Sequence, residues 1–244
     1  MQPPRARTLL PPRQRWPALA ALALVLLALV LRLPGLNWDG GNFFHPDERS
    51  LYLRAEQMYD TLTDAPNWRA DANRDFPLDT PGWPSPATFL DPDASPLNPH
   101  WYPLGSVLIY VLVALRFVLE AFMEQVRLQD LATAGRALAA CADAGTVGLL
   151  FLLGRRLYGA RTGLLAALLG ALSVGAIQLA HVYRPEPFVV PLALGLFWWL
   201  INLTERGGRR EHLMVGLFVG LSFALRGSSL PLLAPLALVY AALV

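Results

Sequence analysis

The sequence predicts an all-α integral membrane protein that crosses the bilayer several times. Of its 244 residues, 55% are hydrophobic, and many lie in long runs such as "WPALAALALVLLALVLRLPGL". A spanning helix needs about 20 consecutive, mostly apolar residues. All twenty basic residues are arginine, and they gather between the apolar runs. The net charge of only +2 gives no indication of nucleic-acid binding, so we expect the lipid bilayer as the main partner surface.

The first predicted span follows a basic tail. Residues 1–16 carry four arginines, and an apolar run over 17–36 follows directly. A secretory signal also begins in this way, but no small-residue cleavage pattern follows the run. We therefore expect a cytoplasmic tail over 1–16 and an uncleaved anchor.

Further apolar blocks predict the remaining spans. They lie at 134–154, 163–181, 187–203 and 212–244. The last block is long enough for two helices, which would meet near Gly227 and Pro231. The chain stops inside an apolar run, so we expect 17–244 to be a transmembrane domain cut short at its C-terminal end. The single cysteine, Cys141, lies in an apolar stretch and is predicted to be a small core residue.

A polar region with eleven carboxylates, 37–102, follows the first span. Its later part, 65–103, predicts irregular loop because closely spaced prolines disrupt helices and central strands. Its earlier part, "DERSLYLRAEQMYDTL", predicts an amphipathic helix lying on the membrane, with Glu56 off the apolar face. The apolar positions at spacings of three and four are Leu51, Ala55, Met58, Tyr59 and Leu62.

Hydropathy alone does not decide whether residues 103–127 span the membrane. The twelve Leu, Ile, Val and Phe residues up to Phe122 favour insertion, and Arg116 and Glu120 oppose it by up to about 3 kcal/mol each. An interfacial position places the arginine clusters at 154–161 and 205–212 in the cytoplasm, as the positive-inside rule prefers. We favour a second juxtamembrane helix, with its charged stripe toward water and the first outer loop over 37–133.

Charged residues recur at the predicted outer ends of the helices. Ionisable groups at membrane depth are functional candidates by default. The candidates are His45, Asp47, Glu48, Arg136, Arg184, Glu186 and Arg226.

Structural explanations compete with a functional one. Asp47 and Glu48 could cap a helix that begins at Pro46. Arg136 could extend to the interface from within the membrane, and Arg184 could form a loop ion pair with Glu186. Asp143, seven residues after Arg136, is predicted to be a structural partner of an arginine or a polar contact between helices.

The combination of carboxylates and arginines suits sugar transfer from a lipid phosphate. A carboxylate can take the proton from an acceptor hydroxyl as it attacks a sugar carbon. The planar guanidinium binds phosphate oxygens in pairs, so arginines can hold the departing phosphate.

The order of several motifs resembles a known family. These are "LNWDGG", "HPDER", "SPLNP", the long stretch from "GRALAACADAG" to "HVYRPEPF", and "GLSFALRGSSLPLL". Over residues 32–240 they resemble the N-terminal module of the GT-C superfamily. More narrowly, they resemble bacterial glycosyltransferases of family 39, which are related to protein O-mannosyltransferases and aminoarabinose transferases.

The resemblance implies a GT-C type module with juxtamembrane helices in the first extracytoplasmic loop. It implies inverting transfer from a polyprenyl-phosphate sugar to a protein, lipid or glycan acceptor, outside a bacterial plasma membrane. Asp47 then corresponds to the catalytic base and Glu48 to its acidic neighbour. Arg136 and Arg226 would lie toward the donor, with Arg226 facing the lipid phosphate.

Three questions stay open at this stage. Relatives usually carry Asp where this chain has Glu186, which leaves a divalent metal undecided. A transporter whose intramembrane charges line a pathway is an alternative class, although no internal repeat is found. A scaffold without enzymatic activity is another.

Overall fold

The computed structural model describes residues 12–63, 86–92, 95, 97–99 and 101–243, and these form helices joined by turns, with no strand. This confirms the predicted all-α fold class. The helices are α1 (Pro12–Arg32), α2 (Pro46–Thr63), α3 (Pro86–Leu90), α4 (Val107–Glu120), α5 (Leu128–Tyr158), α6 (Ala160–Leu172), α7 (Val174–Ala180), α8 (Glu186–Arg206), α9 (Arg209–Leu225), the 3₁₀ turn η2 (Leu230–Leu232) and α10 (Leu233–Leu243). Most of the predicted loop over 65–103 lies outside the described residues, and α3 occupies part of it.

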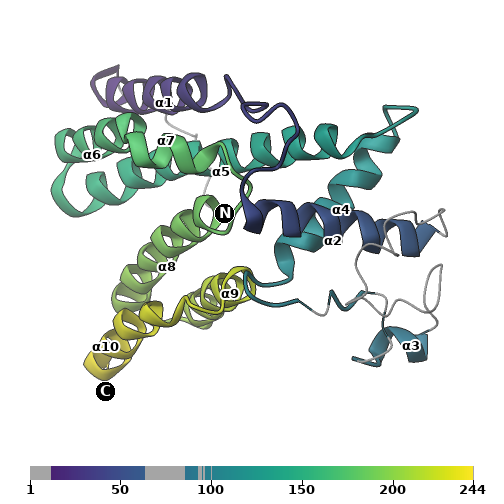
Figure 1. Cartoon of the computed structure of the whole chain (residues 1–244). Helices are drawn as coiled ribbons and strands as arrows, with labels where there is room; N and C mark the ends of the chain where they lie inside the picture. The colour runs from purple at the N-terminus through teal and green to yellow at the C-terminus, as the bar shows by residue number, and fades with distance from the viewer. Residues whose placement is uncertain (1–11, 64–85, 93–94, 96, 100, 244) are drawn as a thin grey trace, which may run out of the picture.

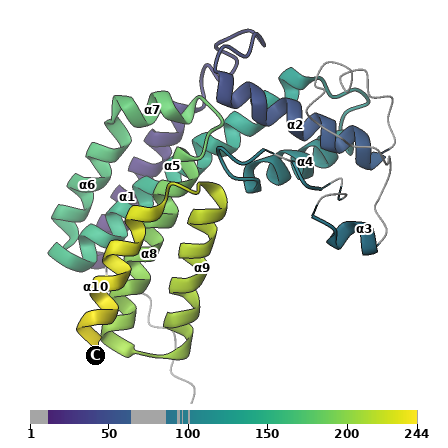
Figure 2. The ribbon, with the colours of Figure 1, turned by 60° about the horizontal axis from the view of Figure 1, so that its bottom comes forward.

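The helices form two parts that share α5 (Figures 1 and 2). α1 and α6 to α10 form a bundle with α5, whereas α2 and α4 lie side by side and project from one end of that bundle. The first turns of α5 contribute Leu131 and Ala139 to a core with α2 and α4. Further along, Val147 and Phe151 of α5 pack with α1 and α6. α5 therefore fixes the projecting pair against the bundle.

Two of the described helices, α5 and α8, are long and apolar enough to cross a membrane. The pair α6 and α7 is a third candidate, but its helices meet at Ser173 with a bend of 57°, where the sequence predicted one unbroken span over 163–181. The apolar part of α1, residues 16–32, and residues 230–243 are shorter.

The other predicted spans coincide with helices, but the helices begin or end at residues other than those predicted. α1 ends at Arg32, because Pro34 and Gly35 follow. α5 begins at Leu128, earlier than predicted, because Arg127 and Asp130 form a reciprocal cap at its start. The last block consists of two helices, α9 and α10, as predicted.

The predicted amphipathic helix is α2, and its five apolar positions are all buried. They pack against α4 and α5, so this apolar face is covered by protein. Glu56, predicted to lie off this apolar face, is also covered by protein. Glu56 is 5% exposed and accepts a hydrogen bond of 3.1 Å from Arg116 of α4.

Helix α4 is shorter than the segment considered for spanning. Its 14 residues measure roughly 21 Å at 1.5 Å per residue, against roughly 30 Å for the hydrocarbon core of a bilayer. Its predicted charged stripe toward water is wrong for Arg116, which is buried between Glu56 and Glu120. The stripe also ends early, because the helix stops at Glu120. The juxtamembrane position of α4 stays a prediction.

Asp143 is the partner of an arginine, as predicted. Arg32 Nε lies 2.5 Å from Asp143 Oδ2, and both residues are buried. The same guanidinium donates to the carbonyl oxygens of Ala171 and Gly170, so this pair ties α1, α5 and α6 together. Cys141, by contrast, is exposed, and its predicted core position is wrong.

Candidate active site

The motif at 45–49 starts α2, and its two acidic residues lie in different surroundings. Pro46 is the first helical residue, and Asp47 and Glu48 follow in the first turn. Consecutive helical residues point about 100° apart, which separates the two carboxylates. Glu48 is fully buried, whereas the Asp47 side chain is 41% exposed.

Glu48, Asp39 and Arg136 form a cluster that we call the buried triad. Each of the three is at most 3% exposed. Arg136 Nη2 lies 2.7 Å from Glu48 Oε2 and 2.7 Å from Asp39 Oδ2; Nε donates to Glu48 Oε1 and Nη1 to Asp39 Oδ1. Nη1 also donates to the carbonyl oxygen of Leu36. A guanidinium has five N–H donors, so each one has an acceptor.

The turn after α1 orients Asp39. Its Oδ1 accepts a hydrogen bond from the backbone N–H of Gly41, and its Oδ2 from that of Phe43. Gly40 and Gly41 have φ angles of 58° and 84°, a backbone region that glycine enters without strain. The "DGG" sequence therefore builds the turn that presents this carboxylate to Arg136.

Asp39 is expected to make stability fall in acid. The hydrogen bond from Arg136, with those from Gly41 and Phe43, lowers the Asp39 pKa from 3.8 to about 2. A lowered folded-state pKa stabilises the fold above pH 3.8, by roughly 2 kcal/mol here, and this contribution is lost as the pH falls toward 2. Thermal unfolding of the wild type and of Asp39→Asn should therefore differ most above pH 4, with a gap that narrows toward pH 2. A gap independent of pH would contradict the ionised Asp39–Arg136 pair.

The buried triad also fixes the turn between α7 and α8. Glu48 Oε1 accepts a hydrogen bond of 2.8 Å from the backbone N–H of Tyr183. Tyr183 is itself buried, and its hydroxyl donates to the carbonyl oxygen of Leu108 in α4. Because Arg184 follows directly, Glu48 and Tyr183 set the position of its backbone.

Five side chains from three segments meet beside the triad in what we call the charged cluster: His45, Asp47, Arg184, Glu186 and Arg226. Arg184 Nη2 lies 3.0 Å from Glu186 Oε1 and 3.9 Å from Asp47 Oδ2. Arg184 Nη1 donates to His45 Nε2 at 3.2 Å. Arg226, directly after α9, donates to the same Glu186 Oε1. These residues come from the start of α2, the α7–α8 turn with the first residue of α8, and the end of α9.

The charged cluster contains buried polar atoms that have no hydrogen-bond partner among the described residues. They are His45 Nδ1, Arg184 Nε and Glu186 Oε2. Buried polar atoms are usually paired, and exceptions gather where a ligand, water or ion completes the set. The charged cluster is therefore the better candidate for substrate contact, since every N–H of Arg136 in the buried triad is already used.

The predicted site residues thus divide into two groups. Five of the seven meet in the charged cluster, and the substrate contacts expected of them stay predictions. Glu48 and Arg136 were expected to be a catalytic neighbour and a substrate ligand, but their burial and mutual bonding favour a positioning role. Sequence reasoning missed Asp39, which the adjacent "GG" could have indicated, and Tyr183, for which the sequence gives no signal.

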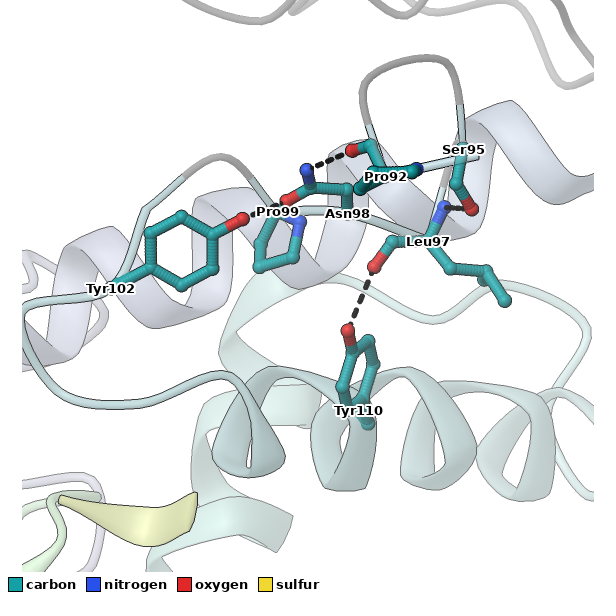
Figure 3. Close-up of a pocket in the computed structure, with 7 residues that line it drawn as sticks. All are labelled: Pro92, Ser95, Leu97, Asn98, Pro99, Tyr102 and Tyr110. Carbon is teal, nitrogen blue, oxygen red and sulfur yellow. Dashed lines mark hydrogen bonds between the residues drawn. The ribbon is translucent and has the colours of Figure 1, made fainter. Parts of the chain in front are cut away.

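Of two hollows in the structure, one includes a residue of the charged cluster in its wall. The larger, about 520 Å³, is lined by Tyr102, Tyr110, Asn98, Ser95, Leu97, Pro92 and Pro99. Figure 3 shows that its polar groups bond to one another: the Tyr110 hydroxyl donates to Leu97 O and Asn98 donates to Pro92 O. None of its lining residues is a carboxylate or an arginine. The smaller, about 260 Å³, includes Glu186 in its wall.

A metal site is not apparent from the side chains. The described residues hold no group of three or more His, Cys, Asp or Glu that could bind an ion. In addition, Glu186 Oε1 is occupied by two arginines. We therefore derive no step through a metal.

The fold and the site define a helical integral membrane protein in which carboxylates and arginines meet at one end of a helix bundle. Residues 105–244, more than half of the chain, match the model of the dolichyl-phosphate-mannose-protein mannosyltransferase family. The chain belongs to this family, and so it is a GT-C type membrane glycosyltransferase similar to mannosyltransferases. The match includes Arg136, Arg184, Glu186 and Arg226 but begins after Asp47. Searches of curated proteins and of solved structures gave no significant match.

Proposed function

We propose that the protein transfers a sugar, in the first instance mannose, from a polyprenyl-phosphate donor to a hydroxyl of a protein acceptor. The observation that carries this proposal is the charged cluster, in which Arg184 lies 3.9 Å from the partly exposed Asp47 and shares Glu186 with Arg226. The family match supports the sugar and the acceptor class.

Asp47 is the proposed general base. It is the exposed carboxylate of the pair at the start of α2, so an acceptor hydroxyl can reach it. The hydroxyl oxygen bonds to the anomeric carbon while Asp47 takes its proton. In the same step the bond between that carbon and the phosphate oxygen breaks, which inverts the configuration and releases polyprenyl phosphate.

Arg226 and Arg184 are the proposed ligands of the departing phosphate. Their guanidinium groups meet at one carboxylate oxygen of Glu186, so they can also meet at one phosphate group. Arg184 lies 3.9 Å from Asp47, so a phosphate bound by Arg184 would lie next to the proposed base. Positive charge held there stabilises the charge that develops on the leaving phosphate.

An extracytoplasmic site is supported by the distribution of arginines. Arg155, Arg156 and Arg161 lie near the α5–α6 turn, and Arg206, Arg209 and Arg210 near the α8–α9 turn. Figure 2 shows these two turns at the end of the bundle opposite the α7–α8 and α9–α10 turns. Cytoplasmic loops are enriched in arginine and lysine, so the charged cluster belongs on the other side.

A transfer assay tests the proposal. Purified full-length protein in liposomes is given radiolabelled polyprenyl-phosphate mannose and a serine- or threonine-containing acceptor peptide. We expect label in the peptide, with the anomeric configuration of the product inverted when read by NMR. Substrate flux across the liposome membrane without any transfer would favour the transporter alternative instead.

A further inference from the structure

Glu186 holds the two arginines of the charged cluster in the way a bound anion would. Its Oε1 accepts from Arg184 Nη2 at 3.0 Å and from Arg226 Nη1. The first arginine lies in the α7–α8 turn and the second after α9, 40 residues beyond Glu186. A single carboxylate oxygen therefore joins two parts of the site.

This bonding leaves several donors and acceptors unused. Within the part of the chain that the structure describes, Glu186 Oε2 and Arg184 Nε are buried and have no hydrogen-bond partner. Leaving such atoms unpaired costs free energy, so the arrangement is less favourable than one that satisfies them. The buried triad shows the contrast, since all five donors of Arg136 have acceptors there. Glu186 is thus easier to displace than Glu48.

We propose that Glu186 is a resident anion that occupies the phosphate position of the empty site and is displaced when the donor binds. The phosphodiester of the donor carries one negative charge, as a carboxylate does, but its oxygens are arranged tetrahedrally, so they can bind Arg226 and also the unused Nε of Arg184. The cavity of about 260 Å³ beside Glu186 gives its side chain room to turn away. The inference rests on the proposed function, because it assumes that the cluster receives the donor's phosphate.

Displacement has a measurable consequence. Any anion that enters must first break the bridge between Glu186 and Arg226, so Glu186 lowers the affinity of the site for phosphate. Its removal should therefore strengthen phosphate binding, whereas the removal of a substrate ligand or of a catalytic group would weaken binding or leave it unchanged.

The experiment measures binding of farnesyl phosphate to the full-length protein in detergent. We expect Glu186→Gln to bind it about five- to tenfold more tightly than the wild type, which corresponds to roughly 1 to 1.4 kcal/mol. The matched control is Glu205→Gln at the other end of α8, which removes the Arg156–Glu205 pair of 2.7 Å. Its affinity should equal that of the wild type.

Further variants and probes separate the causes. The increase in affinity for farnesyl phosphate should disappear when Arg226→Gln is added to Glu186→Gln, because Glu186 and the phosphate compete for Arg226. Glu186→Asp, with a shorter side chain, should give a smaller gain and serves if the glutamine variant is unstable. Inorganic phosphate should also bind Glu186→Gln more tightly than the wild type if the headgroup alone displaces Glu186. Farnesol should bind both proteins equally.

Two outcomes overturn the inference. If farnesyl phosphate binds Glu186→Gln with equal or lower affinity than the wild type, Glu186 does not compete with phosphate. If it binds neither protein, the proposed donor site fails as well. Tighter binding by the variant, combined with no sugar transfer by the wild type, would retain the displacement and reject the proposed function.

Discussion

Asp47→Asn is expected to abolish sugar transfer while leaving the protein folded and inserted. The substitution keeps the size of the side chain but removes its ability to take a proton. Loss of a general base lowers the rate of the chemical step by about 10²- to 10⁴-fold. The Asp47 side chain is 41% exposed, and its ionic contact among the described residues is the 3.9 Å approach of Arg184, so the fold does not depend on it. The transfer assay measures the loss of activity, and thermal unfolding of the same variant measures whether the fold is retained.

The matched control for this variant is Asp130→Asn. Asp130 pairs with the exposed Arg127 at the start of α5, and exposed pairs contribute little to stability. It should keep wild-type transfer. Binding of farnesyl phosphate to Asp47→Asn should stay close to the wild-type level, because the proposed role of Asp47 concerns the acceptor proton. Full activity of Asp47→Asn would exclude it as the base, and loss of binding together with unfolding would make it a structural residue.

The meeting of distant charges could be predicted because the chain repeatedly crosses the bilayer. Successive connections between spans lie on alternate sides of the membrane. The arginine clusters indicate which connections are cytoplasmic, so the start of α2, the α7–α8 turn and the end of α9 are predicted to lie together on the other side. The structure brings His45, Asp47 and Arg226 into one charged cluster with Arg184 and Glu186. The pairing within that cluster needs side-chain distances, which no sequence pattern provides.

The sequence pattern indicates that Glu48, unlike Asp47, lies on the buried face of α2. Glu48 precedes Leu51 by three residues and Ala55 by seven, so it lies on the apolar face of the predicted helix. A carboxylate on a buried face requires a partner, which is Arg136. The bend at Ser173 could not be predicted in this way, because "LLGALSVGAIQLA" is apolar on both sides of it and contains no proline.

Substitution of Arg136 is expected to destabilise the protein more than any change in the charged cluster. Arg136→Gln leaves Asp39 and Glu48 buried without their counter-charge. Removing one partner of a buried ion pair costs about 3–5 kcal/mol, and here one residue serves two carboxylates. Arg136→Lys should not restore stability, since an ammonium has three donors for the five acceptors that surround Arg136. The unfolding temperature in detergent and the yield of inserted protein measure the effect.

A compensating variant separates positioning from substrate contact. Arg136→Gln combined with Asp39→Asn and Glu48→Gln removes the unpaired charges, so most of the lost stability should return. Arg127→Gln, which breaks the exposed pair with Asp130, should unfold at the wild-type temperature. If Arg136→Gln keeps wild-type stability but fails to bind farnesyl phosphate, Arg136 contacts the donor, and the buried triad does not hold the site together. If it unfolds early and the triple variant recovers, the triad supports the backbone that carries Asp47 and Arg184.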